Sequence, residues 1–212
     1  MVPADSPLAY LTVDGLAQPD TQPDFSNMST THHYHPFSKL LHWTMGVLWI
    51  SAWFAGFMAV HFRDQLNPHH GLTIWHKGVA ISLVFLIVVR VSWRLMSSPP
   101  PLPDTMGAMM QRAAVAGHIG LYGLALIALP MSGWALSSVA NKPVIMFGLV
   151  QIPPFLPPNK ELVELLRSVH TILSWVCGAM VMGHVLIAFK HHFIDKDGVL
   201  QGMLPRRKSA SN

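Results

Sequence analysis

Four long stretches of the chain are almost entirely apolar, and short polar segments separate them. Three of them, residues 42–62, 113–141 and 168–189, contain no Asp, Glu, Lys or Arg, and the fourth, residues 75–95, contains only three such residues. An α-helix rises about 1.5 Å per residue, so roughly 20 residues cross the hydrocarbon core of a bilayer. The pattern therefore predicts an all-α integral membrane protein, a bundle of four transmembrane helices.

The polar segments predict the domain boundaries. Residues 1–36 are rich in Pro, Asp, Ser and Thr, which is typical of a disordered tail. A transmembrane domain follows at residues 37–192, and then a basic tail at residues 193–212. The longest link, at about residues 135–160, contains five prolines, which cannot continue a helix, so we expect an ordered lid over one end of the bundle. Asn159, a residue type that is preferred at the N-cap, is then the expected N-cap of the fourth helix.

Composition and charge support a membrane location and predict an orientation. Hydrophobic residues make up 51% of the chain and charged residues only 11%, where a soluble domain has about 25%. The net charge is +4, but basic residues gathered in loops orient a membrane protein rather than bind nucleic acid. Their excess predicts that both termini are cytoplasmic and that the lid lies on the opposite side of the membrane, whose lipid surrounds the spans. The basic residues predicted inside are Lys39, Arg90, Arg94, Arg112, Lys190, Lys196, Arg206, Arg207 and Lys208, and those predicted outside are Arg63, Lys77, Lys142, Lys160 and Arg167.

Histidines are the candidate functional residues of the spans, because an ionisable side chain inside a membrane is costly and indicates function. His170 and His184 are 14 residues apart, about 21 Å along a helix and nearly a whole number of turns, so they share one face at two depths. Because successive spans cross the membrane in opposite directions, we expect His42 at the same depth as His184, and His76 at the same depth as His170. His118 lies at the depth of the first pair and, by depth alone, competes with its members.

Two facing imidazoles are the axial ligands that a b-type haem needs, and a four-helix bundle can enclose such cofactors. Zinc normally has three or four protein ligands, and no Cys, Asp or Glu of the spans joins either pair. The single Cys177 predicts a packing residue. Three other interpretations remain open: core histidines with hydrogen-bond partners, a proton relay, and a histidine-lined transporter, which would have no visible chromophore.

Several motifs resemble one known family over about residues 34–208. They are YHPFSKLLHW at residues 34–43, IWHKG around His76, GHIGLYGLALIALPMSG from Gly117, and VHTILSWVCGAMVMGH ending at His184. In this order and spacing they resemble the bacterial cytochrome b561 family, which implies a location in a bacterial inner membrane. The resemblance implies two b-type haems, the cytoplasmic one ligated by His42 and His184 and the outer one by His76 and His170. It also implies that His118 is not a ligand but a neighbour of one or a residue on the quinone side, and a plain packing role for it stays open.

The resemblance further implies electron transfer to a quinone, with ubiquinone as the expected acceptor. Superoxide-oxidising members of the family suggest superoxide as the donor, and Lys142, Lys160 and Arg167 would then steer that anion to the surface. The alternative is an electron-transfer subunit for a separate dehydrogenase or hydrogenase-type partner protein. The outer loop departs from the family pattern at most positions outside residues 147–149, which leaves the donor open. Basic residues near the membrane surfaces are candidate partners of the anionic haem propionates: Arg90 and Lys77, with Lys39, Arg94 and Arg167 as further candidates.

Overall fold

The structure is a computed structural model that describes residues 34–97, 100 and 106–204. Most of the predicted N-terminal tail and the last eight residues of the predicted C-terminal tail lie outside the described residues. Four helical spans are long and apolar enough to cross a membrane, at Pro36–His61, Gly71–Met96, Ala108–Val139 and Lys160–Asp195. The predicted four-span, all-α architecture is therefore confirmed.

The first two spans form an antiparallel pair. Helix α1 (Pro36–His61) begins with proline, which needs no hydrogen-bond acceptor in a first turn, and the His35 ring accepts a hydrogen bond from the Phe37 amide. After the short α2 (Arg63–Leu66), the turn to α3 (Gly71–Met96) is organised by the buried Asn67, whose side-chain oxygen accepts from the Leu72 amide at 3.0 Å. Helix α1 then packs along α3.

The third span changes helix type in its middle. It consists of α4 (Ala108–Gly120), the π-helix η2 (Leu121–Ala128) and α5 (Leu129–Val139). Pro130 lies just after the π-helical segment and lacks the amide hydrogen that an α-helix would use. The Leu129 amide instead reaches back five residues to the Leu124 carbonyl, which is the wider π-type bond. The span thus passes its proline without ending.

The predicted lid begins later than expected and contains a hairpin that the sequence analysis did not predict. Helix α5 continues to Val139 because its last residues contain no proline. Strands β1 (Val144–Met146) and β2 (Val150–Ile152) then pair antiparallel, with Val144 opposite Ile152. The hairpin packs against α3 beside Gly78, where a Cβ atom would come within 2.8 Å of the Ile145 carbonyl oxygen.

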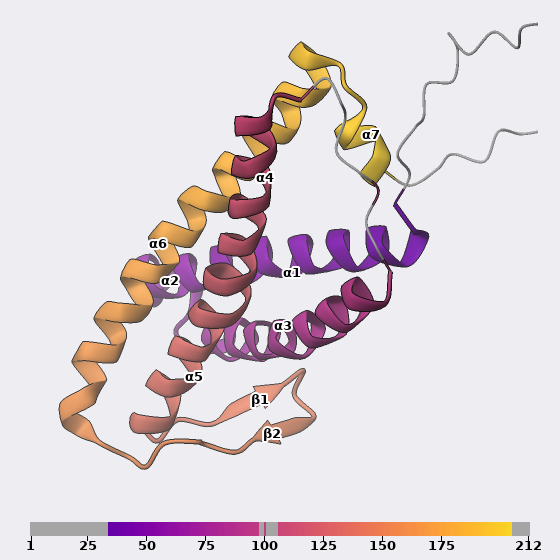
Figure 1. Cartoon of the computed structure of the whole chain (residues 1–212). Coiled ribbons are helices and arrows are strands. Elements are labelled where there is room, and N and C mark those ends of the chain that lie inside the picture. Colours follow the sequence, from indigo (N-terminus) through magenta and orange to yellow (C-terminus); the bar gives the residue numbers. More distant parts are fainter. Residues whose placement is uncertain (1–33, 98–99, 101–105, 205–212) are drawn as a thin grey trace, which may run out of the picture. The chain divides into compact units, whose positions relative to one another are not determined.

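The fourth span, α6 (Lys160–Lys190), begins at Asn159, whose side chain accepts a hydrogen bond from the Glu161 amide at 3.0 Å, so the predicted N-cap is confirmed. The π-helical turn η3 (His191–Asp195) and the short α7 (Val199–Met203) follow within the predicted basic tail. Figure 1 shows α7 between the end of α6 and the start of α1, and the hairpin beside the other end of the spans. The hairpin and α7 therefore lie at opposite ends of the spans.

An apolar core joins the spans at mid-depth. Cys177 is fully buried within it, which confirms the predicted packing role, and its place on α6 is midway between His170 and His184. The indole nitrogen of Trp49 donates to the Ala125 carbonyl at 2.9 Å and ties α1 to η2 in this layer. The core therefore separates the two histidine levels. Its buried members are Met45, Trp49, Leu83, Ile87, Ala125, Leu129 and Cys177.

Candidate functional site

The two histidines predicted for the outer side face each other across the space between α3 and α6. The ring centroids of His76 and His170 are 6.1 Å apart. A metal ion bound to both rings lies about 2 Å from each nitrogen, and each ring centroid is a further distance of about 1 Å away, which gives roughly 6 Å between centroids. The observed separation therefore fits one iron ion held between the two imidazoles.

Each imidazole is oriented by a hydrogen bond at Nδ1, which leaves Nε2 as the nitrogen that could bind iron. The Nδ1 atom of His76 lies 2.7 Å from the Ala52 carbonyl oxygen, which can only accept, so Nδ1 carries the hydrogen. Ser132 donates its hydroxyl to the Leu129 carbonyl, and its oxygen therefore accepts from Nδ1 of His170 at 2.9 Å. Both Nε2 atoms keep a lone pair for a metal, which is the arrangement of metal-bound histidines generally.

Two glycines make room for these rings. A Cβ atom at Gly56 on α1 would lie 2.9 Å from the His76 ring, and a Cβ atom at Gly133 on α5 would lie 2.9 Å from the His170 ring. Real Cβ atoms do not approach other atoms this closely, so any larger residue would displace a ring. The two helices can approach the imidazoles only because these positions lack a side chain.

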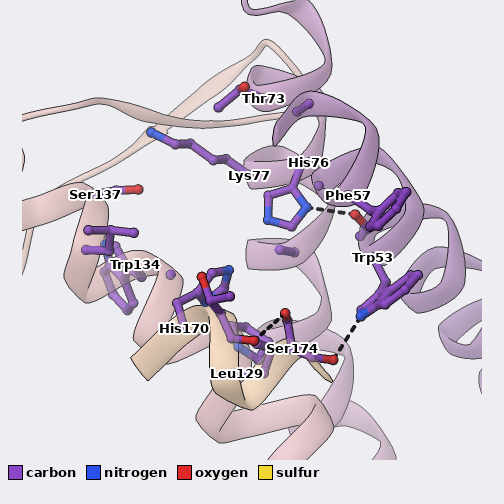
Figure 2. A pocket seen from close by; sticks show the side chains of 18 of the residues that line it. Trp53, Phe57, Thr73, His76, Lys77, Leu129, Trp134, Ser137, His170 and Ser174 are labelled. Atoms are coloured by element: carbon purple, nitrogen blue, oxygen red, sulfur yellow. Dashed lines mark hydrogen bonds between the residues drawn. The ribbon is translucent and has the colours of Figure 1, made fainter. Parts of the chain in front are cut away.

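The outer pair lines a cavity of about 300 Å³, a volume at the lower end of the range for cofactor sites. Figure 2 shows His76 and His170 on facing walls, with the aromatic rings of Trp53 and Phe57 on one side. Lys77 also lines the cavity. The planar aromatic walls, the two imidazoles and a single cation suit a flat, apolar group with anionic substituents, so the residues present fit a haem.

The inner histidines form a second pair with the same spacing. The ring centroids of His42 and His184 are also 6.1 Å apart. His118 lies beside His184 at a centroid distance of 5.3 Å, which is shorter than an intervening iron ion requires. Its Nδ1 donates to the Ala114 carbonyl at 2.7 Å. The spacing thus favours His42 over His118 as the partner of His184, although His118 touches that ring.

The basic residues predicted to bind haem propionates or to attract superoxide lie in different parts of the structure. Lys77 lines the cavity, and Lys142 is exposed just before the hairpin. Lys160 is exposed at the start of α6, and Arg167 forms an exposed ion pair with Glu164 at 3.1 Å, which offsets part of its charge.

On the inner side, the Arg90 guanidinium donates to the Tyr122 hydroxyl at 3.0 Å and to the Ser38 carbonyl at 3.3 Å. The Lys39 ammonium is buried and donates to the Leu204 carbonyl at 3.0 Å. Arg94 is exposed. Among the inner propionate candidates, Arg90 and Lys39 thus have protein contacts that link separate parts of the fold.

Residues 33–206, which are most of the chain, match the sequence model of the family described as prokaryotic cytochrome b561. This protein belongs to the prokaryotic cytochrome b561 family. Membership implies b-type haem and membrane electron transfer, and the histidine pairs could supply the ligands of such a haem. The expectation drawn from the sequence motifs is therefore confirmed at the level of the family.

Curated relatives of this cytochrome b561 have similar lengths. It is 33% identical to cytochrome b561 homolog 2 of Escherichia coli over 182 residues, which are 85% of this chain and 96% of that relative. It is 28% identical to cytochrome b561 homolog 1 of the same organism, over 81% of this chain and 98% of the relative. It is 27% identical to a protein of Yersinia pestis named "Probable superoxide oxidase CybB", over 79% of this chain and 93% of that relative.

Sequence reasoning missed the groups that hold and accommodate the outer rings. These groups are Gly56, Gly133, the Ser132 hydroxyl and the Ala52 carbonyl. Glycine inside an apolar span is a signal for close approach of another group, and it could have been used for the first two. The partners of the ring nitrogens leave no such signal, because they depend on which helix faces which.

Proposed function

We propose that this cytochrome b561 binds two b-type haems, one at each histidine pair, and transfers electrons from a donor on the outer, periplasmic side to ubiquinone. The observation that carries the proposal is the presence of two facing pairs with the same 6.1 Å separation, at two depths of one four-span bundle. When bound, haem supplies one-electron chemistry, while the protein supplies ligation, orientation and a dry surrounding.

The residues around the outer pair support an electron entry point there. The cavity lies at the end of the spans that carries the hairpin, and its polar wall includes Lys77. The unequal distribution of basic residues between the two ends favours this end as the periplasmic one, with both termini in the cytoplasm. The inner pair then lies near the cytoplasmic face.

Superoxide is the donor that we propose first. Each superoxide anion gives up one electron and leaves as dioxygen, and two such electrons with two protons convert one ubiquinone to ubiquinol. The likeness to the Yersinia protein named as a probable superoxide oxidase supports this donor. Exposed cations that would attract an anion lie just before the hairpin, at Lys142, and in the first part of α6, at Lys160 and Arg167, which belong to the end that we propose as periplasmic.

A second candidate function is an electron-transfer subunit that receives electrons from a partner protein. The hairpin gives it specific support because Phe147, Leu149 and Val150 are 59%, 86% and 50% exposed. An exposed apolar group at the outer end suits a protein contact. The two candidates share the haem sites and differ in the donor.

Neutralising the outer cations separates the two candidates. We expect the variant Lys142→Met, Lys160→Met, Arg167→Met to be reduced more slowly by superoxide, with a flatter dependence on ionic strength. Attraction between exposed charges is screened over about 10 Å at 0.1 M salt, so the wild-type rate should fall as salt rises. The measurement is reduction of the purified haem protein by pulse-generated superoxide at several ionic strengths.

A control variant with the same loss of charge on the predicted inner side, Arg112→Met, Arg207→Met, Lys208→Met, should retain the wild-type rate and salt dependence. An uncharged reductant should reduce all three proteins at similar rates. If superoxide fails to reduce the wild-type protein even with ubiquinone present, superoxide is not the donor and the electron-transfer subunit becomes the better account.

His118 provides a test of the inner ligand set. Because His42 and His184 have the spacing of an axial pair and His118 only touches the second, His118→Ala should keep two haems per chain. We expect slower ubiquinone reduction if this ring lies on the quinone side. Haem content and the quinone reduction rate are the measurements, and loss of one haem would contradict the chosen pairing.

A further inference from the structure

The short helix α7 connects the two helices that carry the inner histidines. Among the described residues, α1 packs along α3 whereas α6 packs along α5 and η2, so α1 and α6 meet mainly through side chains. At the inner end, α7 follows α6 through a tight turn and reaches the start of α1 (Figure 1). The spacing of His42 and His184 therefore depends on contacts beyond direct helix packing.

Two side chains of α1 hold the end of α7. The Lys39 ammonium donates to the Leu204 carbonyl at 3.0 Å, and the Trp43 indole nitrogen donates to the Met203 carbonyl at 2.9 Å. These are carbonyls at the C-terminal end of a helix, which lack partners within it and carry partial negative charge. Lys39 and Trp43 lie on either side of His42, and Trp43 also contacts its ring at a centroid distance of 5.7 Å.

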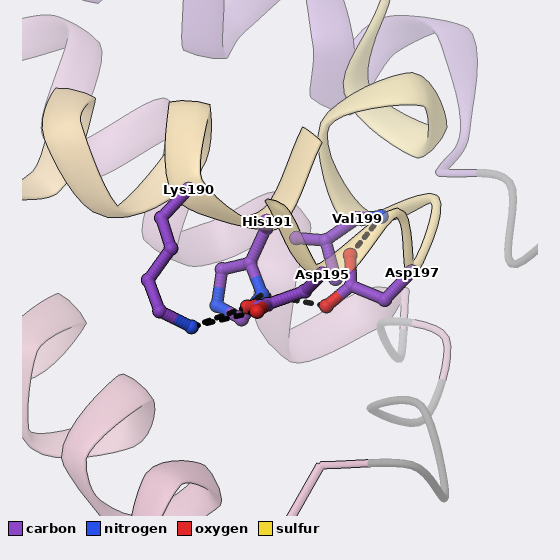
Figure 3. A network of polar contacts seen from close by, with 5 residues as sticks. All are labelled: Lys190, His191, Asp195, Asp197 and Val199. Atoms are coloured by element: carbon purple, nitrogen blue, oxygen red, sulfur yellow. Dashed lines mark hydrogen bonds and ion pairs between the residues drawn. The ribbon is translucent and has the colours of Figure 1, made fainter. Parts of the chain in front are cut away.

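A polar network fixes the turn from α6 to α7 (Figure 3). His191 is 7% exposed and its Nδ1 lies 2.5 Å from Asp197 and 3.1 Å from Asp195. The Lys190 ammonium contacts Asp195 at 2.6 Å. The other oxygen of Asp197 accepts from the Val199 amide at 3.1 Å and so caps α7 at its first residue.

The network and the two α1 contacts together account for the presence of α7. The helix has five residues, far fewer than the roughly 12 that a helix needs to be even marginally stable by itself in water. Its order must come from contacts at its two ends. One end is fixed to α6 and the other to α1, so α7 acts as a bridge between them.

We propose that α7 is a clasp that sets the distance between His42 and His184, with Lys39 and Trp43 as positioning residues. Its effect on a haem rests on the proposed function. The outer half of the bundle has a different connection, because the Trp53 indole nitrogen donates directly to the Ser174 carbonyl of α6 at 2.9 Å. Loosening α7 should therefore change the inner site and leave the outer site unchanged.

The test uses Lys39→Met, Trp43→Phe and the double variant in the full chain, with Trp53→Phe as a matched control. Hydrogen exchange of the Gly202 and Leu204 amides, which bond to Gly198 and Leu200, should become about tenfold faster in the double variant. In redox titrations of Trp43→Phe, which keeps the Lys39 charge, the midpoint potential of the inner haem should shift while that of the outer haem stays. Trp53→Phe should leave both the α7 amides and the inner potential unchanged.

Faster exchange with an unchanged inner potential would overturn the positioning role, and unchanged exchange would overturn the clasp itself. The single variant Trp43→Phe keeps the buried ammonium, so it supplies the same readouts if the double variant folds poorly. Exchange needs no haem and tests the α7 contacts independently of the proposed function. A wild-type protein without haem would instead contradict the proposed function.

Discussion

Alanine at His76 or His170 is expected to remove the outer haem and leave the inner haem in place, and alanine at His42 or His184 should do the reverse. Each haem would lose one of two axial ligands, while the other site is separated from it by the apolar core. The remaining imidazole would hold the iron weakly, because even loss of a group that orients a ligand typically costs about 10- to 100-fold in metal affinity, and loss of the ligand itself should cost more.

Haem content per chain and the reduced-minus-oxidised spectrum measure this outcome. The natural control is His69→Ala, since this histidine is exposed in the turn between α2 and α3 and is not part of the cavity lining. It should retain two haems. Two haems in all four ligand variants would contradict the pairing, and a protein without any visible chromophore would favour the transporter interpretation.

Adding a single methyl group at Gly56 or Gly133 should remove the outer haem from most molecules. The new Cβ atom would lie 2.9 Å from a ligand ring that a hydrogen bond already holds in place. The same change raises helix propensity by about 1 kcal/mol, so the helices themselves should become more stable. Loss of haem despite a better helix former would show that the ring position, rather than the stability of the span, is affected.

The matched control for this change is Gly46→Ala on α1, where a Cβ atom meets nothing within 4 Å. All three variants exchange one glycine for alanine within a span. The control should keep the outer haem, as measured by its spectrum and by haem content. Normal outer haem in both test variants would mean that the His76 and His170 rings can move without losing the iron, contrary to their fixed orientation here.

The sequence alone was sufficient to predict the number of spans and the relative depths of the histidines along them. Both follow from helix periodicity, because a rise of about 1.5 Å per residue converts spacing directly into depth. His170 and His184 lie on one helix, so their separation is a local property of α6. The Asn159 cap is also local, since it involves an amide only two residues away.

Only the tertiary structure decided which groups from other helices meet those rings. The Ala52 carbonyl bonds to His76 across 24 residues of chain, and Ser132 bonds to His170 across 38. The hairpin of the lid is paired within itself but lies against Gly78 of α3, and α7 is held by side chains about 160 residues away. Such contacts depend on the rotation and tilt of each helix, which its own apolar pattern leaves open when lipid and core are both apolar.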